Sequence, residues 1–249
     1  MYAQTGQKEY NMNIACIFAG GSGQRMKTNG KPKQFLELHG KPIIIHTLEL
    51  FENCVDVDAI IVACIPDWID YLDKLITKFC ITKVKFVVPG GSTGQESIYY
   101  AVRKAADNFP EDSIVLIHDG VRPLIDEELI SKNIQTVKQF GSCITSTPCY
   151  ETIVEAHEEK VVLNIPKRDV LYTAQAPQGF FLKDMIKVHE EERKAGRNNA
   201  IDSCSLMKSH GYDMHLLEGP RSNIKITTPD DFYIFRALYD LRENDQIFG

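Results

Sequence analysis

Four short apolar runs, each followed by turn residues and then by a segment with helical spacing, restrict the possible fold of this chain more than any other feature. The runs predict strands at residues 12–18, 59–64, 83–88 and 113–118. Helices are predicted at residues 43–51, 67–79, 95–106 and 126–140. Strands that alternate with helices at this spacing are typical of crossover units, which place successive strands parallel to one another. We therefore expect an α/β fold with an open, doubly wound and mostly parallel sheet.

The segment at residues 150–172 breaks this alternation. Its sequences ETIVEA, KVVLNI and DVLYTA have the pattern of short strands joined by polar turns. An arm of this kind exposes strand edges and apolar side chains, and a second copy of the chain is the simplest partner to cover them. We therefore predict a protruding β-arm over this segment and a homodimer that forms through it.

The rest of the chain contains no internal repeat, low-complexity tract or Pro/Gly-rich linker. Beyond the arm, the sequence predicts a helix near residues 182–193, a strand near residues 214–217 and a last helix from Pro229. A chain of 249 residues can bury a full core around one central sheet. Residues 1–249 are therefore expected to form a single domain that includes the arm.

Composition and charge argue against several classes of partner. The formal net charge of −6 disfavours a broad nucleic-acid surface, because phosphate backbones are bound mainly by clustered Lys and Arg side chains. The chain has no apolar run of the ~18 residues that a membrane span needs, and its first residues lack the apolar core of a secretory signal. We expect a cytoplasmic protein without nucleic-acid or membrane partners.

Seven cysteines are present, and none forms a C-x-x-C pair. Several lie within apolar runs such as IACIFAG and IIVACIP. This pattern favours reduced, buried thiols over disulfides or a zinc site.

Three loops are candidates for a ligand site, because ligands of open α/β sheets bind outside the carboxyl ends of the strands. These loops are residues 19–25, 90–97 and 119–123. The first is rich in glycine, so its backbone can approach a ligand and its amides can meet anionic oxygens. A tight turn between strand and helix is the alternative interpretation. Met26 occupies the third glycine position of the dinucleotide pattern G-x-G-x-x-G, and the P-loop sequence GK[ST] is absent.

Charged residues flank these loops. Arg25 and Lys33 place two cations beside the glycine-rich loop, which suits the phosphates of a nucleoside triphosphate; a solvated pair of surface charges is the alternative. Asp119 ends the fourth predicted strand at the same edge of the sheet. A carboxylate there can hold Mg2+, which accepts oxygen ligands and keeps several waters. An ordinary turn or helix-capping aspartate is the alternative for Asp119.

Seven motifs in a fixed order resemble one family of enzymes. They are AGGSGQRM, PKQFLELHGKPIIIHTLELF, PGGSTGQESI, LIHDGVRP, the arm at residues 151–168, QAPQGF and EGPRSNIKITTPDDF. Together they are similar to the cytidylyltransferase family that includes the ribitol-5-phosphate and the 2-C-methyl-D-erythritol 4-phosphate cytidylyltransferases. The resemblance runs from about residue 13 to residue 241.

The resemblance implies a Rossmann-like nucleotidyltransferase domain that transfers CMP from CTP to a polyol phosphate and releases pyrophosphate, with Mg2+ as cofactor. It also implies a homodimer joined by the arm. Carried over by matched motif, the residues that would bind the nucleotide are Ala19, Gly20, Gly21, Gly23, Gly91, Ser92, Ser97, Asp119 and Gly120, with Asp119 as the magnesium ligand. The catalytic cations on the phosphates would be Arg25, Lys33 and Lys225. The polyol phosphate would be bound by Arg122 and, from the arm of the neighbouring subunit, by Thr152 and Arg168.

Such a transfer needs positioning and charge stabilisation more than covalent chemistry, because both reactants are strongly anionic. The attacking group is already an ionised phosphate and needs no general base. We therefore expect the seven histidines, including His118 beside Asp119, to be structural or surface residues.

Three positions depart from the 2-C-methyl-D-erythritol 4-phosphate branch of the family. Gly94 stands where that branch commonly has an arginine, and Ser222 replaces an acidic residue that could provide a second magnesium ligand. Ile201 precedes Asp202, where that branch tends to have a threonine. Asp202 itself fits the family pattern and could equally begin a helix as its N-cap.

The choice of polyol phosphate depends on features that point in two directions. Those resembling ribitol-phosphate enzymes are Ala19-Gly20-Gly21, Val121, the helix containing Trp68, and Cys204. Those resembling 2-C-methyl-D-erythritol 4-phosphate enzymes are Gln95-Glu96-Ser97 and Gln178-Gly179-Phe180. We expect D-ribitol 5-phosphate or a similar straight-chain pentitol phosphate, with 2-C-methyl-D-erythritol 4-phosphate as the alternative.

A non-catalytic nucleotide-binding protein is the alternative from another class. Loss of a phosphate-binding cation or of the magnesium carboxylate would indicate it. None of these groups is lost, since the chain retains Arg25, Lys33, Asp119 and Lys225. A nucleotide-dependent oxidoreductase is disfavoured because the dinucleotide motif is incomplete.

Overall fold

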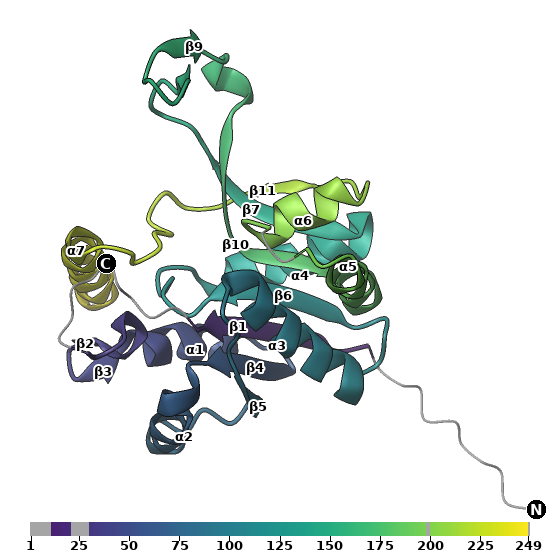
Figure 1. The fold of residues 1–249 in the computed structure, drawn as a ribbon. Coiled ribbons are helices and arrows are strands. Elements are labelled where there is room, and N and C mark those ends of the chain that lie inside the picture. The colour runs from purple at the N-terminus through teal and green to yellow at the C-terminus, as the bar shows by residue number, and fades with distance from the viewer. Residues whose placement is uncertain (1–10, 21–29, 198–199, 249) are drawn as a thin grey trace, which may run out of the picture.

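The computed structural model describes residues 11–20, 30–197 and 200–248, and its centre is a mostly parallel sheet (Figure 1). Among these residues, seven strands pair in the order β11-β7-β10-β6-β1-β4-β5. Their bounds are β1 (Asn13–Ala19), β4 (Ala59–Cys64), β5 (Val84–Pro89), β6 (Ile114–Asp119), β7 (Ser142–Pro148), β10 (Tyr172–Phe181) and β11 (Leu216–Glu218). Strand β10 runs antiparallel to both of its neighbours, and the remaining pairs are parallel. The predicted α/β fold with a mostly parallel sheet is confirmed.

Helices cover both faces of the sheet. One face carries α1 (Ile43–Asn53), α2 (Ile69–Lys78) and α4 (Glu127–Phe140), and the other carries α3 (Gly94–Asn108), α5 (Leu182–Lys194) and α6 (Ser203–Ser209). In β1, Ala15 and Ile17 are buried against the first set of helices, whereas Ile14 and Cys16 are buried against the second. Burial on both faces explains why the central strands are continuous apolar runs, since alternate side chains all enter a core.

Side-chain caps fix where several helices begin. Thr93 accepts a hydrogen bond from the backbone amide of Glu96 at the start of α3, and Asp126 does the same for Leu129 at the start of α4. Asp202 accepts from the amide of Ser205 and caps α6, which confirms the N-cap alternative for Asp202. Such caps satisfy amides that the first helical turn leaves without a partner.

The sequence did not predict β7, because its pattern is polar although the strand is almost entirely buried. The hydroxyl of Thr145 donates to the carbonyl of Pro177 at 2.7 Å, and that of Ser142 donates to the carbonyl of Asp213 at 2.7 Å. Hydrogen bonds of this kind let polar residues occupy a core strand. The sequence also did not predict a small hairpin, formed by β2 (Glu37–Leu38) and β3 (Lys41–Pro42).

The predicted arm projects from the body where β7 ends and β10 begins (Figure 1). Near its end, β8 (Glu155–Ala156) and β9 (Val162–Asn164) form a two-stranded antiparallel sheet. The third expected arm strand, DVLYTA, is only partly correct: residues 168–170 form a 3-10 turn, whereas residues 172–174 are a strand but belong to β10 of the central sheet. The arm is too thin to bury its apolar side chains, so they remain exposed.

The carboxyl-terminal helix α7 (Pro229–Phe248) lies beside the hairpin of β2 and β3. Its Phe235 is fully buried in a separate cluster with Leu38, Ile43, Val121 and Ile226. This packing anchors the segment before α7 against the loop that follows β6. No described helix has both the length and the apolar character required to span a bilayer.

The expected burial of the cysteines is correct in part. All seven cysteines are free thiols, and Cys16, Cys54, Cys64 and Cys143 are buried. Cys80 is exposed, however, because it lies in the turn that follows α2 rather than in an apolar run.

Candidate active site

A cleft of about 390 Å³ opens at the carboxyl edge of the central sheet. It is bordered by the ends of β1 and β6, the loop after β5, the 3-10 turn η2 (Lys33–Phe35) and the segment before α7. The described residues of the three loops that the sequence selected, which are only Ala19 and Gly20 for the first loop, therefore meet at one site, as expected for strands whose carboxyl ends share an edge. Its described lining is Phe18, Ala19, Gly20, Lys33, Gln34, Gly91, Ser92, Thr93, Gly94, Ser97, Asp119, Val121 and Lys225.

Most of the predicted site residues lie in this cleft, but some do not. Gly120 and Arg122 are adjacent to the cleft lining, while Thr152 and Arg168 lie on the arm. Gly21, Gly23 and Arg25 fall outside the described residues. Gly120 has a packing role: a Cβ atom there would come within 2.7 Å of Ile44 Cδ1.

Asp119 lies at the centre of a charged cluster. Its Oδ2 accepts a hydrogen bond from Arg122 Nε at 2.7 Å, and its Oδ1 lies 2.5 Å from Lys225 Nζ. Burial raises the pKa of the Asp119 carboxyl, but the charges of Arg122 and Lys225 outweigh burial and hold that pKa below its ordinary value. Asp119 is therefore ionised near neutral pH.

Arg122 joins two segments that border the cleft. Besides Asp119, its guanidinium donates to the carbonyl oxygen of Asn223 at 2.8 Å, and the Arg122 side chain is only 12% exposed. In this arrangement Arg122 holds Asp119 and the segment before α7 in place. The geometry therefore gives Arg122 a structural contact in addition to the substrate contact expected from the sequence.

Two lysines from opposite ends of the chain line the same cleft. Lys33 is buried, and its ammonium donates to the carbonyl oxygen of Ile226 at 2.8 Å. Lys225 is the neighbour of Ile226, lines the same cleft and keeps 40% of its side chain exposed. The amide of Ile226 in turn donates to the carbonyl of Val121 at 3.0 Å. Two positive charges in one concave site favour an anionic ligand.

Gln34 is a cleft residue that the sequence analysis did not single out. Its side-chain amide donates to the carbonyl oxygen of Ala19 at 2.6 Å, and the residue is almost completely buried. This bond fixes the end of β1, where the glycine-rich loop begins. In the sequence, the neutral amide directly after Lys33 is the feature that could have indicated this role.

The loop after β5 packs closely against Gly20. A Cβ atom on Gly20 would come within 2.7 Å of Ser97 Oγ, so only glycine fits without a shift. The Ser97 hydroxyl accepts a hydrogen bond from the amide of Gly91 at 3.0 Å and donates to the carbonyl of Thr93 at 2.9 Å. Ser97 thus shapes this loop as well as lining the cleft. The amino terminus of α3 also borders the cleft, and such termini favour anions.

His118 lies beside the charged cluster but is not suited to proton transfer. Burial lowers the pKa of His118 to about 4, so its ring is neutral near pH 7. Its Nε2 lies 3.1 Å from the carbonyl oxygen of Arg122, and its ring packs on Phe51. The arrangement agrees with the expectation that this histidine is structural.

Asp119 is the only carboxylate among the described residues that line the cleft. Ser222, where an acidic residue could have provided a second ligand, lies 3.4 Å from Arg242 Nη2 through its hydroxyl. A hard cation such as Mg2+ takes few protein ligands and completes its shell with water and phosphate oxygens. One buried, ionised carboxylate beside a cationic cleft fits that requirement.

The chain matches the family model described as 2-C-methyl-D-erythritol 4-phosphate cytidylyltransferase over residues 13–240. It is 55% identical over 238 residues to a ribitol-5-phosphate cytidylyltransferase of Vibrio parahaemolyticus, covering 96% of this chain and 100% of that protein. It is 51% identical over 238 residues to a ribitol-5-phosphate cytidylyltransferase of Streptococcus agalactiae, covering 96% of this chain and 99% of the relative.

More distant similarities extend to the other branch. A 2-C-methyl-D-erythritol 4-phosphate cytidylyltransferase of Clostridium botulinum is 32% identical over 228 residues, covering 92% of this chain and 97% of that protein. The crystal structure of 4-diphosphocytidyl-2C-methyl-D-erythritol synthase from Anaerococcus prevotii matches with a TM-score of 0.79 and 29% identity, covering 92% of this chain and 96% of that one. The chain therefore belongs to the 2-C-methyl-D-erythritol 4-phosphate cytidylyltransferase family of nucleotidyltransferases.

Proposed function

We propose that this protein transfers the cytidylyl group of CTP to D-ribitol 5-phosphate and releases CDP-ribitol and pyrophosphate. The observation that carries the reaction is the cleft in which Lys33 and Lys225 face the same space as the ionised carboxylate of Asp119. The choice of ribitol 5-phosphate is supported by relatives of that name at 51–55% identity, against 32% for the 2-C-methyl-D-erythritol 4-phosphate enzyme compared above.

The chemistry is an exchange at the α-phosphorus of CTP. A phosphate oxygen of ribitol 5-phosphate forms a bond to that phosphorus, and the bond to the oxygen bridging to the β-phosphorus breaks, so that pyrophosphate leaves with the electron pair. No proton has to be removed from an already ionised nucleophile. The ammonium groups of Lys33 and Lys225, with Arg25 as a further candidate, reduce the repulsion between the two anions and stabilise the leaving charge.

Asp119 is the residue that we propose holds Mg2+. When bound, the ion supplies positive charge to the phosphates and orients them for in-line displacement. In the structure, both Asp119 oxygens contact cations, Arg122 on one side and Lys225 on the other. Lys225 is the more exposed of the two, with 40% of its side chain accessible against 12% for Arg122, so we expect Lys225 to move toward a phosphate when the metal binds.

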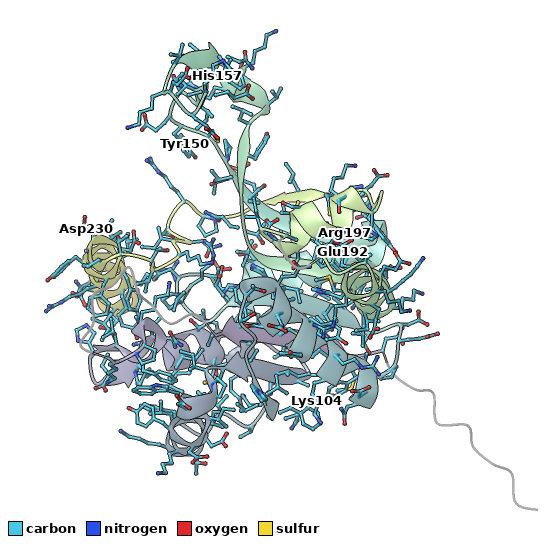
Figure 2. The ribbon with its side chains drawn as sticks, in the orientation of Figure 1. Lys104, Tyr150, His157, Glu192, Arg197 and Asp230 are labelled. Carbon is cyan, nitrogen blue, oxygen red and sulfur yellow. The ribbon has the colours of Figure 1, made fainter. Side chains whose placement is uncertain are left out.

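We further propose a homodimer in which the arm of one subunit reaches the cleft of its partner. Several apolar side chains along the arm are between 51% and 71% exposed, and their number in so thin a segment favours burial against another chain. They include Tyr150, Val154, Val161, Val162, Leu163, Ile165 and Val170. Figure 2 places Tyr150 on the part of the arm nearer the body and His157 near the end of the arm.

Thr152 and Arg168 are candidates for contacts with the polyol phosphate across the dimer. Both are exposed on the arm, and one Arg168 Nη1 donates to the backbone carbonyl of Tyr150 at 3.3 Å. This bond orients the guanidinium on the arm while leaving other donors for a phosphate. A cytoplasmic location is also proposed, since an exposed free thiol such as Cys80 is typical of a reducing compartment.

The test is pyrophosphate release from CTP and Mg2+ with each polyol phosphate supplied separately. We expect turnover with D-ribitol 5-phosphate and a much lower kcat/KM with 2-C-methyl-D-erythritol 4-phosphate. A higher kcat/KM with 2-C-methyl-D-erythritol 4-phosphate would instead assign that compound as the substrate, which the match to the family model of that name favours. Absence of pyrophosphate release with both substrates would refute the enzyme assignment and leave a nucleotide-binding protein.

A further inference from the structure

Glu96, in the first turn of α3, reaches back over the loop that follows β5. Its Oε2 accepts hydrogen bonds from the amide of Ser92 at 2.7 Å and from the Ser92 hydroxyl at 2.8 Å. Thr93 Oγ1 accepts from the Glu96 amide at 3.1 Å. In an ordinary capping box the glutamate would bond to the amide of the cap residue itself. Here it bonds one residue earlier, to a residue that lines the cleft.

The loop is built to accommodate this side chain. A Cβ atom on Gly91 would overlap the Glu96 side chain at its Cβ, Cγ and Oε2 atoms, so glycine is required there. The amide of Gly91 donates to Ser97 Oγ, one residue beyond Glu96. Glu96 and Ser97 therefore bind two successive amides of the loop. Ser92 and Thr93 are both exposed, so burial does little to fix their conformation.

The other oxygen of the Glu96 carboxylate is also held. Oε1 accepts a hydrogen bond from the Tyr100 hydroxyl at 2.9 Å and lies 3.8 Å from Arg193 Nη1 on α5. The hydrogen bonds from Ser92 and then that from Tyr100 lower the pKa of Glu96 below its ordinary value, so the carboxylate stays ionised. The loop that borders the cleft is thereby connected through Glu96 to two helices of the body.

We propose that Glu96 is a positioning residue that holds residues 90–93 in the conformation that receives the nucleotide. The inference rests on the proposed function, because it takes the cleft to be the nucleotide site. Glu96 acts on the ligand through Ser92 rather than by contact. A loop ordered in advance binds its ligand without a further loss of conformational entropy, so removal of Glu96 weakens nucleotide binding more than it slows the chemical step.

The test compares Glu96→Ala with Glu96→Gln. We expect Glu96→Ala to raise KM for CTP about tenfold, with a change in kcat of less than about threefold. The reason is that the entropy lost when the loop becomes ordered around CTP weakens CTP binding and does not affect the chemical step. Glu96→Gln should restore KM to within about threefold of the wild-type value, since its amide oxygen can still accept from Ser92 and its amide nitrogen can donate to Tyr100. Tyr100→Phe should raise KM for CTP in the same direction by a smaller factor.

The matched control is Glu190→Ala. Glu190 also joins α3 to α5, since its Oε1 lies 3.3 Å from the Tyr99 hydroxyl and 3.3 Å from Arg103 Nη1, but it has no contact with the loop. We expect its KM for CTP to be unchanged. A wild-type KM in Glu96→Ala, a loss confined to kcat, or an equal rise in KM in Glu190→Ala would each overturn the proposal.

Calorimetric titration with CTP separates this inference from the proposed function. It measures nucleotide affinity without turnover, so the ratio of the dissociation constants of Glu96→Ala and wild type can be obtained even if the polyol phosphate has been assigned wrongly. If Glu96→Ala does not fold, Glu96→Asp, whose side chain is one methylene shorter, and Tyr100→Phe provide the same comparison. The positioning role would be rejected if both Tyr100→Phe and Glu96→Ala bound CTP with unchanged affinity. Where Glu96→Ala does not fold, Glu96→Asp takes its place in this comparison.

Discussion

Lys33 Nζ donates a hydrogen bond to the backbone carbonyl oxygen of Ile226 at 2.8 Å, across 193 positions of the sequence. The bond joins the turn that precedes β2 to the segment that carries Lys225 and leads into α7. The same segment is fixed from the other side by Asp231, whose carboxylate accepts from the amides of Thr227 and Thr228 at 2.8 Å each. The two lysines that line the cleft are therefore connected through the same segment, since Lys33 bonds to the residue that follows Lys225.

Substitution Lys33→Met should remove a charge from the cleft while preserving most of the buried side-chain volume. We expect kcat to fall on the order of 100-fold, because an ammonium that stabilises developing phosphate charge is lost. Stability should fall by about 1 kcal/mol, since the carbonyl of Ile226 loses its donor. Pyrophosphate release at saturating substrates and urea unfolding measure the two effects.

Lys31→Met is the matched control for this variant. Lys31 lies two residues earlier and pairs with Glu37 at 3.0 Å on the surface, with 38% of its side chain exposed. We expect its kcat to stay within about twofold of the wild-type value, because surface ion pairs contribute little. A kcat of Lys33→Met that matches that of Lys31→Met would contradict the phosphate role of Lys33.

Asp119→Asn should abolish most of the dependence of the rate on Mg2+. Asparagine offers a neutral oxygen in place of a carboxylate, so we expect kcat to fall on the order of 100-fold or more and saturation to require a higher Mg2+ concentration. The rate is measured as a function of Mg2+ concentration, with circular dichroism to verify folding. Asp112→Asn is the control, since Asp112 pairs with Lys183 at 2.5 Å on the surface. Identical Mg2+ profiles for both variants would reject Asp119 as the ligand.

The central strands and the helices between them could be predicted because they are buried on both faces. Every residue of β4 and β6 is buried, which requires the continuous apolar runs that the sequence shows. Strand β7 is equally buried but reads as polar, because Ser142 and Thr145 satisfy their hydroxyls through partners distant in sequence. The pattern of apolar and polar residues along β7 does not show which distant residues pair with these hydroxyls.

The position of Asp119 in the cleft followed from topology, since it ends a central parallel strand. The contact between Lys33 and Ile226 did not, because it depends on where α7 packs. Glu96 was also not recognised, because a glutamate three residues after a threonine is typical of a helix cap. Its bonds to Ser92 depend on the conformation of the loop, which local sequence does not determine.

Glu192 should make the stability of the fold depend on pH. Figure 2 shows Glu192 and Arg197 side by side, and Arg197 Nε lies 3.0 and 3.1 Å from the two carboxylate oxygens. Hydrogen bonds from Arg197 and then from His210 lower the pKa of Glu192 to about 2 from its ordinary value of 4.5. A depressed folded-state pKa stabilises the protein above pH 4.5, and this contribution is lost as the pH falls toward 2.

We therefore expect Glu192→Gln to be less stable than wild type at pH 7 by about 1 kcal/mol, a value reduced by solvent screening of the exposed Arg197. The difference should shrink as the pH is lowered below 4.5. Urea unfolding of both proteins at a series of pH values measures it. Glu128→Gln, which alters a fully exposed pair with Lys132, should show no resolvable difference. If the difference in the free energy of unfolding between Glu192→Gln and wild type stays constant from pH 7 to pH 3, the lowered pKa of Glu192 is contradicted.

Val162→Asp should convert the proposed dimer into a monomer. Val162 lies in β9 near the end of the arm and is 53% exposed, so a charge there disfavours burial against a second chain without disturbing a core. Val55→Asp is the control, because Val55 is 88% exposed on the body and away from the arm. Analytical ultracentrifugation should give monomers for the first variant and dimers for the second. Dimers in both would reject the arm as the interface.

Combining two defective subunits tests whether the arm completes the site of its partner. Lys33→Met damages the cleft of its own subunit, whereas Arg168→Ala should damage the cleft of the other one. In a heterodimer of the two, one site then carries both defects and the other carries neither. We expect such a heterodimer, purified through two different affinity tags, to recover about half of the wild-type activity. If Arg168 serves its own subunit, each site carries one defect, and the heterodimer is no more active than the average of the two parent homodimers.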